Sequence, residues 1–149
     1  MKIELKDLTE DNIEQCFELK VASEQMQYIA SNENSWKVAK ENKKIARPFA
    51  IYCDGNMVGF TMFAFDEEYE DPNDRFWLWR FMIDETLQGN GYGTAALQAV
   101  IRYFREHGAN NIRLSTKESN TTALSVYRKA GFCDMAERNG EEIVLELRL

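Results

Sequence analysis

The sequence of 149 residues has few of the residues that build disulfide-rich, metal-binding or membrane-spanning proteins. Its three cysteines, Cys16, Cys53 and Cys133, form no CxxC pair, so we expect buried thiols without a disulfide framework or a zinc site. The single histidine, His107, excludes a metal cluster built on histidines and argues against a Ser–His–Asp triad. No apolar run reaches the roughly 18 residues of a membrane-spanning helix. We therefore expect no metal and no membrane partner.

Composition and charge limit the remaining classes. Only two prolines and no biased tract predict a folded chain, and the length predicts one domain over residues 1–149. A net charge of −7 without a basic stripe predicts no nucleic-acid partner and favours a cationic substrate, although acidity commonly serves only solubility. The first residues, "MKIELKDLTED", lack the apolar segment of a signal peptide, so we expect a cytoplasmic protein.

Hydrophobic periodicity predicts the element order β-α-α-β-β-β-α-β-α-β-β. The expected strands are residues 2–8, 48–53, 57–65, 75–83, 111–116, 132–138 and 142–149. The expected helices are one around residues 13–20, then 31–44, 91–107 and 120–130, and residues 24–31 are loosely helical. Asp54-Gly55 and Asn139-Gly140 are typical of hairpin turns, and the apolar strand at 75–83 is expected to be central. The fold class is α/β (α+β), a mixed sheet with helices on both faces.

The segment "RFMIDETLQGNGYGTAALQAV", residues 80–100, places three glycines between a strand and a helix. Such a turn forms an anion site, because unpaired N–H groups and the helix dipole point outward. A nucleotide P-loop is excluded, since Gly93 is followed by Thr94 and no lysine. A dinucleotide-binding reading of "GYGTAA" lacks the acidic residue after the next strand, and "DETLQ" separates the glycines from the strand. A purely structural turn stays open.

Two motifs resemble one family. "QGNGYG", residues 88–93, is similar to the Q/R-x-x-G-x-G/A signature of the GNAT family of acetyl-CoA-dependent N-acetyltransferases. "NTTALSVYRKAGF", residues 120–132, resembles a second motif of that family in the expected order. The resemblance covers essentially the whole chain and implies a GNAT-type, mostly antiparallel twisted sheet of about seven strands.

The resemblance also implies a site for acetyl-CoA where the fourth and fifth strands separate. The pantetheine arm would pair with the main chain of the fourth strand and with Asn120, and the diphosphate would lie on the glycine loop, where Gln88 could donate its amide. Many relatives carry Arg or Lys in this loop, which here has Gln88 and Asn90. The implied acetyl-CoA-binding residues are Phe81, Met82, Ile83, Gln88, Gly89, Asn90, Gly91, Tyr92, Gly93, Thr94 and Asn120.

Acetyl transfer to an amine by direct attack in a ternary complex requires two proton transfers. An alkylamine has a pKa near 10.4 and is mostly protonated at neutral pH, so a base is needed. Glu118, just past the fifth strand, is the predicted base and Asp84 is the other candidate, with a solvated loop acid as the alternative for each. Tyr127 resembles the tyrosine that protonates the departing thiolate in this family, with a core residue as the alternative.

The acceptor is predicted to be a polyamine such as spermine or spermidine. The segments "SEQMQYIA", "YCDGNMVGFTMF", "EEYEDPND" and "FWLWRFMID" resemble the bacterial diamine and polyamine acetyltransferase branch. A cation in the fourth strand, Arg80, departs from that pattern. An acetyltransferase for a peptide or protein N-terminus or an aminoglycoside-like amine, and a non-catalytic acyl-CoA sensor, stay open, as does a homodimer. The alternatives are that the acidic loop is only solvated and that Trp79 is a core residue. The predicted acceptor-binding residues are Glu67, Glu68, Glu70, Asp71 and Trp79.

Overall fold

The computed structural model of the protein describes residues 1–26, 28 and 30–149. Its strands are β1 (Ile3–Asp7), β2 (Ala46–Cys53), β3 (Asn56–Phe65), β4 (Phe76–Ile83), β5 (Asn111–Lys117), β6 (Cys133–Asn139) and β7 (Glu142–Arg148). Its α-helices are α1 (Ile13–Glu18), α2 (Asn32–Glu41), α3 (Tyr92–Glu106) and α4 (Thr121–Lys129). This confirms the predicted element order. The loose helix expected over residues 24–31 begins as a 3₁₀ turn, Ser23–Gln25, and its residues 27 and 29 lie outside the described residues.

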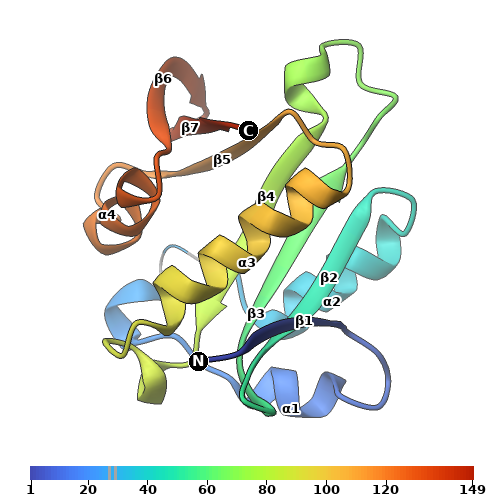
Figure 1. The fold of residues 1–149 in the computed structure, drawn as a ribbon, viewed down its shortest axis with the longest axis vertical. Helices are drawn as coiled ribbons and strands as arrows, with labels where there is room; N and C mark the ends of the chain where they lie inside the picture. Colours follow the sequence, from blue (N-terminus) through green and yellow to red (C-terminus); the bar gives the residue numbers. More distant parts are fainter. Residues whose placement is uncertain (27, 29) are drawn as a thin grey trace.

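The strands form one sheet in the order β1-β2-β3-β4-β5-β7-β6, which makes β4 central as predicted (Figure 1). Neighbouring strands are antiparallel except β4 and β5, which are parallel. The turns between β2 and β3 and between β6 and β7 use the predicted glycines, with φ of +87° at Gly55 and +63° at Gly140. The sheet is therefore mixed and mostly antiparallel.

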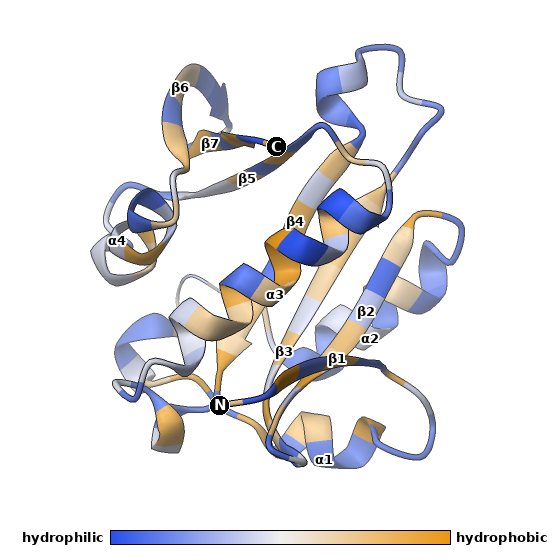
Figure 2. Cartoon of the chain, in the orientation of Figure 1, coloured by the Kyte–Doolittle hydropathy of each residue, from blue (hydrophilic) through white to orange (hydrophobic). Residues whose placement is uncertain are grey.

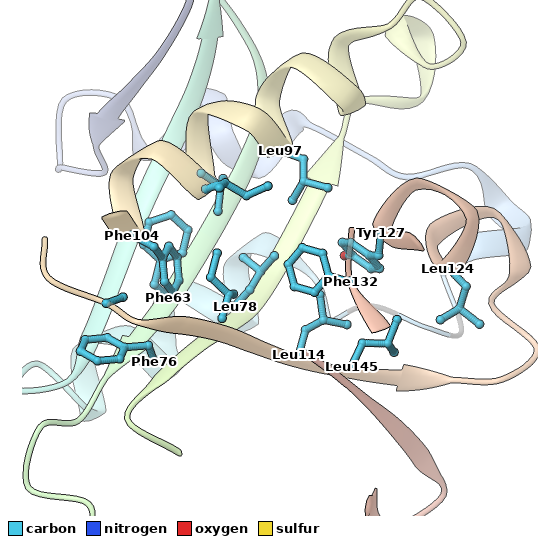
Figure 3. Packing of buried hydrophobic residues seen from close by; sticks show 14 of the residues in the cluster. Phe63, Phe76, Leu78, Leu97, Phe104, Leu114, Leu124, Tyr127, Phe132 and Leu145 are labelled. Carbon is cyan, nitrogen blue, oxygen red and sulfur yellow. The ribbon is translucent and has the colours of Figure 1, made fainter. Parts of the chain in front are cut away.

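Helices cover both faces of the sheet, because successive strand residues point to opposite sides. One core lies under α3 and α4 and includes Phe63, Phe104 and Leu145 (Figure 3). The other lies under α1 and α2 and includes Cys16 and Phe60. Figure 2 shows hydrophobic residues along the central strands and hydrophilic ones in the loop between β3 and β4.

A bulge in β4 opens the middle of the sheet. Phe63 pairs with Leu78 and Met62 pairs with Arg80, which leaves Trp79 as an extra residue on β4. A bulge of this kind bends its strand and increases the local twist. The pairing of β4 with β5 consists of the single register pair Trp77–Arg113. Beyond this pair β5 leaves β4 at a wide angle (Figure 1).

Cys16 and Cys53 are buried as predicted, but the prediction is wrong for Cys133, which is exposed at the start of the edge strand β6. Burial raises the pKa of the Cys16 thiol to about 12, so this thiol stays protonated. No helix in the described part of the chain is long and apolar enough to cross a membrane.

Candidate active site

A cavity of about 1070 Å³ lies where β4 separates from β5. Its walls come from these strands, from β7, from the glycine loop and from the first turns of α3 and α4. This volume is at the upper end of small-molecule sites, which span about 300–1000 Å³. The predicted site residues that line it are Trp79, Phe81, Met82, Ile83, Gln88, Gly89, Gly91, Gly93, Thr94, Asn120 and Tyr127.

The three glycines of the loop differ in what requires them. Gly89 and Gly91 have φ of +83° and +81°, in the left-handed region that glycine tolerates best. Gly93 is helical, and a Cβ on it would meet only Ile83 Cγ1, at an ordinary 3.9 Å. Neither the backbone nor the packing therefore requires a glycine at position 93. Its missing side chain instead leaves the start of α3 open toward the cavity.

The start of α3 has main-chain donors without helical acceptors. Its first hydrogen bond joins Ala95 N to Gly91 O at 3.1 Å, so the N–H groups of Tyr92, Gly93 and Thr94 precede the helical ladder. The first turn contains no acidic residue, and the cap, Gly91, has no side chain to accept from these groups. The helix dipole adds about half a positive charge at this end. A phosphate or diphosphate group fits here.

The polar side chains of the loop bind the loop itself. Gln88 Nε2 donates to Ile83 O and to Gln25 Oε1, each at 3.0 Å. Asn90 Nδ2 donates to Leu87 O at 3.1 Å and to Gln88 O at 3.3 Å. Gln88 lines the cavity, whereas Asn90 and Tyr92 do not. The main-chain N–H groups, which the resemblance also implies, are the donors left for an anion, because the Gln88 amide donates within the protein.

Tyr127 and Asn120 project from α4 and its N-cap into the cavity. Tyr127 is 9% exposed, and its ring lies 6.5 Å from that of Phe81 and 5.8 Å from that of Phe132 (Figure 3). Burial raises the pKa of Tyr127 to about 12, so the phenol keeps its proton at neutral pH. Asn120 Nδ2 donates to Thr116 Oγ1 at 3.0 Å.

Neither predicted base lies on the cavity wall. Asp84 accepts from Lys20 N at 2.9 Å and from Thr86 N at 3.2 Å. Burial alone would raise the pKa of Asp84, but hydrogen bonds from the Thr86 hydroxyl and from these main-chain groups hold it below its ordinary value, which makes Asp84 a weak base. Glu118 has a side chain that is 63% exposed and forms an ion pair with Arg138. Both carboxylates make local contacts outside the cavity, and this placement gives no support to either as the base.

Of the acids in the loop between β3 and β4, Asp66 and Asp74 line the cavity, together with Tyr69 and Arg75 of the same loop. Glu68 pairs with Lys44 at 3.1 Å, and Asp71 accepts from Asn73 N at 2.9 Å. The predicted acceptor-binding carboxylates are exposed and do not line the cavity: Glu67, Glu68, Glu70 and Asp71. This placement gives no support to their predicted role.

Two further carboxylates on the wall were missed, Glu137 of β6 and Glu142 of β7. The alternation in "EIVLELRL" does separate Glu142 and Glu146 from the apolar Ile143 and Leu145. It could not show that β7 is the neighbour of β5, inserted before β6, and therefore borders the cavity.

Arg113 holds two of the cavity carboxylates. This residue is 4% exposed, and its guanidinium lies 2.7 Å from Asp74, 2.8 Å from Glu146 and 3.6 Å from Glu137. Burial would lower the pKa of Arg113, but these carboxylates raise it above its ordinary value. Because Arg113 faces Trp77 at the last pairing of β4 with β5, the cluster closes one end of the cavity.

Arg80 adds a cation to the wall beyond the bulge. Its Nη1 donates to Trp79 O at 3.0 Å, and its buried Nε has no hydrogen-bond partner in the part of the chain that the structure describes. Burial lowers the pKa of Arg80, and the negative charge of Glu142 opposes this change. A desolvated guanidinium therefore lies within electrostatic reach of Glu142.

Comparison with known proteins agrees with this geometry. The model of the acetyltransferase (GNAT) family matches residues 6–132. The chain is 36% identical to the spermine/spermidine N(1)-acetyltransferase of Bacillus subtilis (strain 168) over 151 residues, 98% of this chain and 99% of that protein. An acetyltransferase from Thermus thermophilus has the same fold, with a TM-score of 0.78, 16% identity and coverage of 100% and 98%. The PaiA N-acetyltransferase from Thermoplasma acidophilum, solved with coenzyme A, has a TM-score of 0.72 and 19% identity, with both chains fully covered. The chain belongs to the acetyltransferase (GNAT) family.

Proposed function

We propose that the protein transfers the acetyl group of acetyl-CoA to a primary amine of a polyamine such as spermine or spermidine. The observation that carries this proposal is the 36% identity to a spermine/spermidine N(1)-acetyltransferase over nearly the whole of both chains. Family membership supports the reaction class, and the full-length similarity supports the acceptor class.

The cavity contains the groups that acetyl-CoA requires. The main-chain N–H groups at the start of α3 would hold the diphosphate, and the absent side chain of Gly93 would let it approach. The edge of β4 at residues 81–83 has no register partner in β5 and would pair with the pantetheine amides. Acetyl-CoA supplies an activated thioester, and Tyr127 holds the proton that the departing sulfur needs.

The acceptor end of the cavity supports a cationic amine through Asp66 and Glu142. Asp74 and Glu137 also line it, but Arg113 pairs with both. Arg80 on the same wall would repel an ammonium group placed beside it. We infer that the ammonium groups of the polyamine bind at Asp66 and Glu142, where the carboxylate of Glu142 offsets the charge of Arg80.

The test is release of the CoA thiol from acetyl-CoA in the presence of separate amines: spermine, spermidine, putrescine, lysine, an aminoglycoside and peptides with a free N-terminus. Turnover confined to polyamines is the expected result. Turnover on peptides or the aminoglycoside alone would refute the acceptor class and leave the reaction class standing. Bound acetyl-CoA without turnover on any amine would favour a non-catalytic acyl-CoA sensor.

We propose that residues 1–149 act as one domain in the cytoplasm, on a small-molecule amine and without a nucleic-acid partner. A homodimer stays open, and light scattering of the purified protein across a range of concentrations would decide it.

A further inference from the structure

Transfer to an alkylamine requires a proton acceptor, and neither carboxylate predicted from the sequence lines the cavity. At neutral pH only about one amine in a thousand is unprotonated, since the pKa of an alkylamine is near 10.4. Four carboxylates line the cavity: Asp66, Asp74, Glu137 and Glu142. Arg113 pairs with Asp74 and Glu137, and Asp66 accepts from Glu68 N at 3.2 Å within its own loop. Glu142 is the remaining candidate.

The carboxylate of Glu142 has a neutral partner. Ser115 Oγ donates to Glu142 Oε1 at 2.8 Å, and Asn139 Nδ2 lies 3.4 Å from the same Ser115 oxygen. Among the described residues no basic side chain lies within 4 Å of Glu142 as an ion pair. A hydrogen bond from a hydroxyl fixes the direction of a carboxylate without neutralising its charge. Glu142 is therefore oriented and still able to accept a proton.

Glu142 and Tyr127 approach the cavity from opposite faces of the sheet. Ile143 and Leu145 of β7 belong to the core that contains Tyr127, so the intervening and flanking residues of β7 point to the other face. Glu142 and Glu146 lie on that other face, and Glu146 contacts Arg113 there. Residues from both faces of the sheet line the cavity, so the cavity extends through the gap between β4 and β5. A proton acceptor and a proton donor thus lie on the two sides of the gap.

The charged groups around Glu142 come from three strands. Arg80 on β4 interacts with it electrostatically, and Lys117 is its register partner on β5. Arg138 on β6 lies next to Asn139, the β6 register partner of Glu142, and pairs with Glu118. These cations surround Glu142 without forming an ion pair with it among the described residues.

We propose that Glu142 is the catalytic residue that accepts the proton of the acceptor ammonium, directly or through one water. This inference rests on the proposed acetyltransferase function. The ammonium transfers one proton to Glu142, and the nitrogen lone pair forms the new C–N bond at the thioester carbonyl. The C–S bond breaks with its electron pair on sulfur, and Tyr127 gives sulfur its proton. The second proton lost by the nitrogen returns to Tyr127 through solvent, and Glu142 releases its proton to solvent.

The test compares wild type with Glu142→Gln, which keeps the shape of the side chain and removes the base. With spermidine at pH 7, kcat/KM is expected to fall by about 100-fold or more, within the range of general-base catalysis. The ratio of wild type to variant should then shrink as the pH rises toward 10, because the free amine increases about tenfold per pH unit. Glu142→Asp, which keeps a carboxylate on a shorter chain, should retain more activity than Glu142→Gln.

Three controls separate the outcomes. Glu141→Gln makes the same charge change at the exposed neighbouring residue and should leave kcat/KM unchanged. Acetyl-CoA affinity and melting temperature should match wild type in Glu142→Gln. A loss that does not vary with pH, or a pH-dependent loss in Glu118→Gln instead, would overturn the role of Glu142. A wild type that binds acetyl-CoA but acetylates no amine would overturn the proposed function, and this inference with it.

Discussion

Replacing Arg113 with methionine tests whether the buried charge cluster holds the closed end of the cavity. Methionine keeps much of the apolar stem and removes the guanidinium. Removing one partner of a buried ion pair costs about 3–5 kcal/mol, because the other partner stays desolvated. Here Glu146 keeps Asn111 at 3.0 Å and Arg148 at 2.9 Å, so we expect about 3 kcal/mol, the lower end.

The pH dependence of this loss has a fixed sign. Burial would raise the pKa of Glu146, but hydrogen bonds from Arg113 and Asn111 hold it below its ordinary value. A carboxyl whose pKa is lowered on folding contributes stability above its unfolded pKa, about 4.3, and loses it as the pH falls through the folded value. The difference in unfolding free energy between wild type and Arg113→Met should therefore be largest near pH 7 and shrink below about pH 4.

The assay is urea unfolding at several pH values, monitored by tryptophan fluorescence. Arg128→Met is the matched control, because Arg128 pairs with Asp134 at 2.7 Å in an exposed bridge and its loss should change stability little. Acetyl-CoA affinity should survive in Arg113→Met, since Ile83 lies roughly 20 Å along β4 from Trp77. A loss equal to that of the control, or one that grows at acidic pH, would refute the reasoning.

Three further predictions concern single residues of the cavity and its support. Tyr127→Phe should lower kcat by about 100-fold or more with acetyl-CoA affinity retained, measured by steady-state kinetics and calorimetry, and an unchanged kcat would exclude it as the acid. Gly93→Ala should stabilise α3 by up to about 1 kcal/mol and weaken acetyl-CoA binding about tenfold, and tight binding in this variant would show that no group approaches position 93. Gly59→Ala should destabilise the fold by about 1–3 kcal/mol in urea, because its Cβ would lie 2.3 Å from Met82 O, and wild-type stability would show that β3 and β4 can separate there.

The order of elements could be predicted because it depends on local periodicity. Strands and helices impose repeats of about 2 and 3.6 residues, and the turns Asp54-Gly55 and Asn139-Gly140 need only their own residues. The bulge at Trp79 could not be predicted in this way, because it is a mismatch between β4 and β3. The separation of β4 from β5, which borders the cavity, likewise involves strands that are far apart in the sequence.

The difference between local and long-range determinants also applies to the acidic residues. A cluster of acids such as Glu67–Asp71 is conspicuous in a sequence, yet the structure exposes it to solvent. Glu142 is one acid in an alternating strand, and its place beside the cavity depends on β7 inserting between β5 and β6. A dense run of charges along the chain thus indicates exposure to solvent. A place beside the cavity depends instead on which strands are neighbours in the sheet.

The sequence indicated the glycine loop as a site, but it could not show that its glycines are there for different reasons. Gly89 and Gly91 satisfy a local demand, a positive φ that shapes the turn and begins α3. Gly93 has helical dihedrals and space for a Cβ, so no feature of the folded chain explains it. A helix would be more stable with alanine there. The fold therefore gives up helix stability at position 93 without a structural need for glycine, which points to a group outside the chain. The main-chain donors beside Gly93 indicate that this group is an anion.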